Sequence, residues 1–169
     1  MMNSIALVTM AMTDYFSGDV RRINHFMKVY AFAKTIGELE GLTPRDQLTL
    51  EVAALTHDIG IKESERKYGS SSGHYQQLEG PPEARALLNT LQIPADVTER
   101  VCWLIAHHHT YANIQNADHQ ILVEADFLVN ICEAAMNQTQ IRAIERKVFR
   151  TAAGGRLLLN LYPASAEEQ

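Results

Sequence analysis

The sequence predicts an all-α protein. Apolar residues recur at spacings of three and four along most of the chain, the period of a helix with one buried face. No run of alternating apolar and polar residues is long enough to indicate a β-sheet. Short polar residues and prolines stand where the helical runs begin. A chain of 169 residues suffices for one core, so we expect a single-domain helical bundle over residues 1–169.

The first predicted helix begins near residues 17–19, whose short polar side chains can cap free backbone amides, and ends near Gly41. The next begins at Thr43, an N-cap that is followed by Pro44 at the first helical position. It is expected to end at residues 57–58.

The middle of the chain is predicted to be irregular before helices resume. Gly60 is expected to let the chain turn away, and residues 63–80, rich in glycine and serine, indicate a loop. Pro81 and Pro82 are expected to open the following helix. The later predicted segments are helices over 81–91, 94–109, 117–136 and 138–150, and a short apolar tail over 157–161, which Gly154 and Gly155 separate from the last helix.

Composition restricts the class of partner. The net charge of −5, from 15 basic and 20 acidic side chains, does not favour binding of duplex nucleic acid. Residues 1–12 lack the basic start of an export signal, and no apolar run approaches the length of a membrane span. We therefore expect a cytoplasmic protein without a membrane partner.

The adjacent pair His57 and Asp58 is the strongest chemical signal. It follows the apolar run 50–55, which would draw both side chains inward, and burying a carboxylate is costly unless a cation or metal neutralises it. His25 and Asp126 also lie on apolar stripes, each in a separate predicted helix. Together these four residues offer two imidazoles and two carboxylates, a candidate set of metal ligands.

This order, a histidine, then a His-Asp pair, then an aspartate, resembles the HD-domain superfamily of metal-dependent phosphohydrolases. Residues 53–60 look like the central motif of that family, and the resemblance covers a motif-bearing core of about 19–135, with C-terminal helices at 138–161. It implies a helical bundle of the HD-domain type. It also implies that one divalent metal is held by His25, His57, Asp58 and Asp126.

The chemistry of the ligands supports a catalytic metal. Mixed nitrogen and oxygen ligands suit Mn²⁺, Fe²⁺, Co²⁺, Ni²⁺, Zn²⁺ or Mg²⁺, and the absence of thiolates argues against a purely structural zinc. The resemblance implies hydrolysis of a small phosphorylated molecule, with a nucleotide as a candidate, by metal-activated water. Asp58 and His57 are then the catalytic residues, and Asp58 would ligate the metal and orient or deprotonate that water.

A second metal is a further candidate. Family members with two metals carry extra histidines in this region, which His107 and His108 resemble; the alternative is a substrate-binding or solvent-facing cluster. Gln76 stands where such members usually have a histidine, although His74 is nearby. We therefore expect one tight metal, with a second as the alternative, and expect His109 to be dispensable for metal binding.

Two cations are candidate phosphate contacts. Lys62 follows the central motif, although a solvated lysine is the alternative, and Arg150 lies in a basic segment that could equally complement a helix dipole. Two other functions compete with the hydrolase: an HD-fold di-iron oxygenase, and a non-catalytic module that binds metal or nucleotide. The sequence leaves the substrate, the metal and the oligomeric state open.

Overall fold

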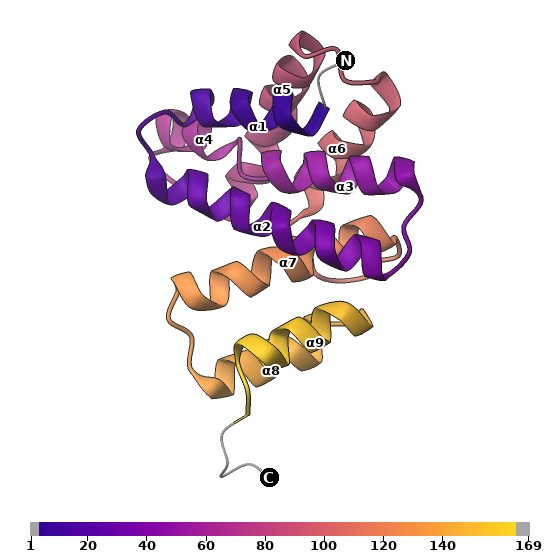
Figure 1. The fold of residues 1–169 in the computed structure, drawn as a ribbon. Coiled ribbons are helices and arrows are strands. Elements are labelled where there is room, and N and C mark those ends of the chain that lie inside the picture. The colour runs from indigo at the N-terminus through magenta and orange to yellow at the C-terminus, as the bar shows by residue number, and fades with distance from the viewer. Residues whose placement is uncertain (1–3, 165–169) are drawn as a thin grey trace.

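Over residues 4–164, the part of the chain that the computed structural model describes, the protein consists of nine α-helices and contains no β-strand (Figure 1). This confirms the predicted all-α class. No helix in this range is long and apolar enough to cross a bilayer. The helices are α1 (Ser4–Tyr15), α2 (Val20–Leu39), α3 (Pro44–Thr56), α4 (Ile61–Tyr68), α5 (Gly73–Thr90), α6 (Ala95–His107), α7 (Ala117–Glu133), α8 (Gln138–Val148) and α9 (Ala152–Leu161).

Helices α2, α3 and α7 form the centre of the bundle. Helix α2 packs against both α3 and α7, and α3 also packs against α6 and α7. Helices α8 and α9 lie on the far side of α7 from α2 and α3, at the bottom of the view in Figure 1. Residues from α2, α7 and the segments that follow α3 and α6 can therefore meet in one place.

The helices that carry the candidate ligands begin as the sequence predicts. The Asp19 carboxylate accepts a hydrogen bond from the backbone amide of Arg22 at 3.1 Å, which caps α2. The Thr43 hydroxyl does the same for α3, and Pro44 takes the first helical position. Each helix buries an apolar face, which holds the polar residues at its inner end in a fixed position.

The prediction of a loop over residues 63–80 is wrong. Helix α4 occupies Ile61–Tyr68, and α5 begins at Gly73. Gly69 ends α4 in the left-handed conformation, with φ of 63°, so the glycines and serines form only a short connection between two helices. Pro81 and Pro82 lie inside α5 and do not open it.

Both ends of the chain also contain helix that the sequence analysis did not predict. Helix α1 precedes the first predicted helix, and α9 runs through Gly154 and Gly155. A Cβ atom at position 154 would collide with the carboxylate of Glu124, so close packing against α7 explains this glycine.

Gly60 has a different role from the predicted one. Its φ of −71° is an ordinary helical value, so it is not needed to turn the chain. A Cβ atom at position 60 would lie 2.6 Å from the backbone nitrogen of Gly80 and 2.7 Å from the carbonyl oxygen of Gln76. The absence of a side chain at Gly60 lets α5 pack directly against the turn that carries His57, which brings Gln76 close to that turn, whereas Gly80 makes room for Ile105 of α6.

A buried carboxylate joins the C-terminal helices to the bundle. Glu124 of α7 accepts hydrogen bonds from the backbone amides of Arg150 at 2.6 Å and Thr151 at 3.0 Å, and from the Thr151 hydroxyl at 2.5 Å. Glu124 is fully buried, so removal of its carboxylate would take away the shared partner of these donors and leave a cavity inside the protein.

Replacement of Glu124 by alanine should lower the free energy of unfolding by about 2–3 kcal/mol, because it removes the hydrogen bonds that these donors share and leaves a cavity. Urea denaturation measures the change. The control is Glu99→Ala, since Glu99 forms an exposed ion pair with Arg85 and should leave the midpoint unchanged. Equal midpoints for Glu124→Ala and the unmodified protein would contradict this role for Glu124.

Candidate metal centre

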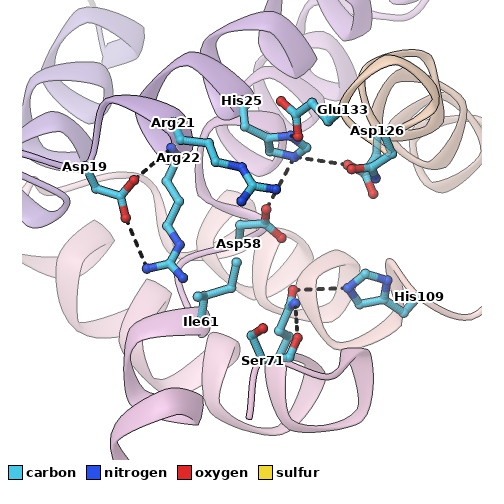
Figure 2. Close-up of a pocket in the computed structure, with 12 residues that line it drawn as sticks. Asp19, Arg21, Arg22, His25, Asp58, Ile61, Ser71, His109, Asp126 and Glu133 are labelled. Carbon is cyan, nitrogen blue, oxygen red and sulfur yellow. Dashed lines mark hydrogen bonds and ion pairs between the residues drawn. The ribbon is translucent and has the colours of Figure 1, made fainter. Parts of the chain in front are cut away.

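Four polar residues from three segments converge at one end of the central helices. His25 comes from α2, His57 and Asp58 from the turn after α3, and Asp126 from α7. His25 Nε2 lies 3.2 Å from Asp126 Oδ1 and 3.3 Å from Asp58 Oδ2. His57 Nε2 lies 3.5 Å from both of those oxygens and 3.3 Å from His25 Nε2. Figure 2 shows His25, Asp58 and Asp126 facing one another.

The other nitrogen of each imidazole is held by an acceptor. His57 Nδ1 lies 2.8 Å from the carbonyl oxygen of Ala54, and His25 Nδ1 lies 3.0 Å from Glu133 Oε2. Because these oxygens only accept hydrogen bonds, both Nδ1 atoms must carry the proton. In a neutral ring the Nε2 lone pair then points at the carboxylates of the two aspartates. Because lone pairs and carboxylates repel one another, this arrangement is favourable only when a proton or a metal ion lies between them.

The imidazole of His108 also points at the carboxylate of Asp58. It is buried, and its Nδ1 lies 2.7 Å from the carbonyl oxygen of Ile105, which assigns the proton to Nδ1. Its Nε2 has no hydrogen-bond partner within residues 4–164 and lies 3.6 Å from Asp58 Oδ1. A buried imidazole nitrogen without a partner is unfavourable unless it binds a ligand. Because this nitrogen faces the carboxylate of Asp58, the ligand that suits both groups is a cation.

The potential ligand atoms fall into two groups that share Asp58. One group is His25, His57 and Asp58, and the other is Asp58, His108 and His109; in each, the ligand atoms lie within 4.8 Å of one another. Asp126 adjoins the first group through its contacts with both histidines. The described residues could therefore hold one divalent metal ion, with room for a second beside it.

His109 is held on the opposite wall of the pocket. Its Nε2 lies 3.1 Å from Gln76 Oε1, and Gln76 in turn donates through Nε2 to the carbonyl oxygen of Ser71 at 2.7 Å. The oxygen of Gln76 must accept, so His109 donates through Nε2 and accepts from the Tyr111 hydroxyl, 3.2 Å from Nδ1. Gln76, where a histidine was expected in a two-metal member, contacts this histidine.

The electrostatics of the cluster correspond to a site for positive charge. Burial disfavours a charged His57, but Asp58 and Asp126 outweigh it and raise its pKa to about 9. Burial likewise opposes charge on His25, whose pKa is raised by contact with Asp126. Burial alone would raise the pKa of Asp58, yet His57 and His108 lower it to about 2. The protein without metal therefore holds protons where a cation is favoured.

The pKa of Asp126 is well below its usual value despite burial, because His25 and His57 contact it. His109 behaves in the opposite way: burial, and then the nearby His108, lower its pKa to about 4. The carboxylates of the cluster are thus ionised at neutral pH, while His109 is neutral.

Four other predicted residues lie away from the four-residue cluster. The ring of His107 stacks on Trp103, with centroids 4.0 Å apart, and its Nδ1 lies 2.7 Å from the Trp103 carbonyl oxygen. His74 is exposed and lies against Tyr75. The remaining two are Lys62, whose Nζ donates to the Tyr15 carbonyl oxygen at 2.9 Å, and Arg150, whose guanidinium donates to the carbonyl oxygens of Arg146, Lys147 and Phe149.

A pocket of about 400 Å³ leads to the cluster, and some of the residues that line it were not predicted. Arg21 precedes His25 by one helical turn, and Glu133 follows Asp126 by two, so helical spacing from the predicted ligands could have found both. Asn130 follows Asp126 by one helical turn and could have been found in the same way, whereas Ser71 carries no such signal. The missed lining residues are Asp19, Arg21, Arg22, Ile61, Ser71, Asn130 and Glu133.

Comparison with known proteins agrees with this geometry. The family model described as HD domain matches residues 22–144, a range that includes all four residues of the cluster. The chain belongs to the HD domain family. A crystal structure of a predicted HD superfamily hydrolase from an uncultured Thermotogales bacterium has a similar fold, with a TM-score of 0.62 and 22% identity over 94% of this chain and 83% of that one. No curated protein sequence matches the chain.

Proposed function

We propose that the protein is a metal-dependent phosphohydrolase that acts on a small phosphorylated molecule, with nucleotides as the first class to test. One observation carries this proposal: the Nε2 atoms of three imidazoles, those of His25, His57 and His108, meet the carboxylates of Asp58 and Asp126. Within residues 4–164, neither carboxylate pairs with a lysine or arginine, so their charge is balanced either by protons on the histidines or by a metal ion that displaces those protons.

We assign the tight metal to His25, His57, Asp58 and Asp126, and a weaker second metal to Asp58, His108 and His109, of which His109 would give up its hydrogen bond to Gln76 or Tyr111 to bind it. Mixed imidazole and carboxylate ligands suit Mn²⁺, Fe²⁺, Co²⁺, Ni²⁺ or Zn²⁺, whereas a structural zinc site usually contains thiolates. When bound, such a metal lowers the pKa of water and polarises a phosphoryl oxygen.

The side chains of the pocket have separate tasks in this proposal. Asp58 faces the pocket with 18% of its side chain exposed, and its low pKa keeps it ionised, so it can accept a hydrogen bond that orients the attacking water. His57 is fully buried and serves to hold the metal. In the hydrolysis, the water oxygen forms a bond to phosphorus, the ester P–O bond breaks, and a proton passes to the leaving oxygen.

Two adjacent histidines provide a matched test of the second metal. His108→Ala should remove the weaker metal and leave about one per chain, whereas His107→Ala should change neither, because His107 stacks on Trp103 outside the cluster. Mn²⁺ titration followed by calorimetry measures both stoichiometries. Equal stoichiometry in the two variants would contradict the assignment of His108. Similarly, His109→Ala should leave the tight metal in place.

The function itself is tested by a screen of phosphate esters and nucleotides with Mn²⁺, Co²⁺ or Fe²⁺, with a chelator-treated sample as control. Phosphate release that depends on the metal supports the hydrolase. A fully loaded protein that releases none would favour the non-catalytic binding module. The shared position of Asp58 between two ligand groups also makes the di-iron oxygenase worth testing. Two irons per chain with O₂ consumption and no phosphate release would favour that enzyme.

A further inference from the structure

A second hollow adjoins the pocket of the metal centre. The pocket of about 400 Å³ and the neighbouring hollow of about 660 Å³ share three lining residues, Asp19, Arg21 and Arg22, so one ligand can extend from one into the other. The hollow is also lined by Lys62. A substrate held at the metal centre therefore has space to continue beside the start of α2.

The pocket and the neighbouring hollow have opposite charge. Apart from the three shared residues, the pocket is lined by the carboxylates of Asp58, Asp126 and Glu133, whereas the hollow is lined by the cation Lys62 and no further acid. This separation suits a ligand that is bound by metal at one end and by basic side chains at the other.

The cations of the hollow differ in whether they are already neutralised. Arg22 pairs with both Asp19 and Glu65, and the distance from Arg22 Nη1 to Asp19 Oδ2 is 3.1 Å. Arg21, by contrast, has no hydrogen bond or ion pair to any residue in 4–164, and Lys62 contacts the Tyr15 carbonyl oxygen and ring but no carboxylate at ion-pair distance. Arg21 and Lys62 thus remain available to an anion.

Arg21 is placed to act together with the metal centre. It lies four residues before His25 in α2, so both side chains leave the same face of the helix. Figure 2 shows the Arg21 side chain extending beside His25 and Asp58, whereas Arg22 turns toward Asp19. An unpaired guanidinium at this position would contact the part of the substrate next to the reacting group.

We propose that Arg21, with Lys62 nearby, binds a second phosphate group of the substrate. The inference rests on the proposed hydrolase function and specifies its substrate class: phosphate esters with two phosphate groups, such as a nucleoside diphosphate or a nucleoside 3′,5′-bisphosphate. The planar guanidinium can donate two parallel hydrogen bonds to one phosphate, which gives both strength and orientation.

Kinetics of Arg21→Ala with Mn²⁺ test this proposal. The substrates are ADP and adenosine 3′,5′-bisphosphate, which have two phosphates, and AMP and p-nitrophenyl phosphate, which have one. For at least one two-phosphate substrate KM should rise about 10- to 100-fold, with kcat within about twofold, because a charge-assisted hydrogen bond is lost in both ground and transition states. The one-phosphate substrates should change by less than about twofold. Which of ADP and the bisphosphate responds identifies the spacing of the two groups.

The matched control is Arg156→Ala, because Arg156 is also exposed and unpaired within the described residues but lies on α9. This variant should have the same KM and kcat as the unmodified protein for all four substrates. Equal losses on one-phosphate and two-phosphate substrates in Arg21→Ala would overturn the proposal, since Arg21 would then act on the reacting phosphate. No change on any substrate would overturn it as well.

A binding measurement separates this inference from the proposed function. Calorimetry with α,β-methylene-ADP and the Mn²⁺-loaded protein requires no turnover, and Arg21→Ala should weaken binding about 10- to 100-fold. If the protein hydrolyses no ester but this dependence is found, the hydrolase is wrong and the second phosphate site is supported. If Arg21→Ala binds the analogue as tightly as the unmodified protein, the phosphate site is wrong, whatever the hydrolysis.

Discussion

His57→Ala should abolish tight metal binding and reduce metal-dependent phosphate-ester hydrolysis by at least about a thousandfold, the loss expected when several kcal/mol of transition-state stabilisation by the metal disappears. His57 is completely buried, and its Nε2 lies 3.5 Å from carboxylate oxygens of both Asp58 and Asp126. The Ala54 carbonyl oxygen fixes the orientation of the ring through Nδ1 at 2.8 Å, so no neighbouring side chain can replace His57 as a ligand in the alanine variant.

The buried position of His57 requires a second variant, because alanine leaves a cavity that could destabilise the fold. Asp126→Asn keeps the size of the side chain but removes its charge, and it should also lose the tight metal. His107→Ala serves as the control for loss of a histidine. Circular dichroism establishes folding, and plasma mass spectrometry measures the metal. Folded Asp126→Asn and His57→Ala proteins that retain one metal per chain would disprove the site.

The second large effect is the dependence of metal affinity on pH. Without metal, the pKa of His57 is raised to about 9, so at neutral pH the ring holds a proton that a metal must displace. Affinity should therefore rise with pH up to about 9. Displacement of one proton gives about a tenfold gain per pH unit, or about 100-fold between pH 6 and pH 8.

Titration calorimetry in buffers of different ionisation enthalpy measures both the affinity and the number of protons released on binding. At least one proton per metal is expected at pH 7. An affinity that does not vary between pH 6 and pH 8, with no proton released, would contradict the assignment of His57 as a ligand.

The same pKa values give the opposite trend for the stability of the metal-free protein. Because the pKa of His57 is raised, the contribution of this residue to the free energy of unfolding is fully present below its ordinary pKa of about 6.5 and is lost as pH rises through about 9. The lowered pKa of Asp58 contributes above its ordinary value and is lost as pH falls toward about 2. Metal binding replaces the protons, so it should stabilise the protein most at the alkaline end of this window.

The all-α class and the starts of the central helices could be predicted because they depend on local features. Apolar periodicity predicted the buried faces of α2, α3 and α7, and the caps at Asp19 and Thr43 act within one helical turn. Residues 63–80 were predicted wrongly because their glycines and serines serve close packing and one sharp helix end. Contacts such as Gly60 against Gly80 depend on tertiary structure and leave no local pattern.

The site shows the same division. The His-Asp pair, His25 and Asp126 share an apolar context that a sequence reveals, and the structure brings them within hydrogen-bond range. The family resemblance named both His107 and His108, although only His108 continues the apolar stripe of its helix; in the structure His107 stacks on Trp103. Nor could it identify the free guanidinium of Arg21, because an absent partner is a property of the folded surface.

The central claim is that the cluster of His25, His57, Asp58 and Asp126 holds a divalent metal. Its most direct test is the metal content of the protein purified without chelators or a histidine tag, measured by plasma mass spectrometry beside the Asp126→Asn variant. We predict about one tightly held metal per chain in the unmodified protein and none in the variant. A folded protein that takes up no divalent metal, even after incubation with Mn²⁺, Co²⁺ or Fe²⁺ at pH 8, would contradict the claim.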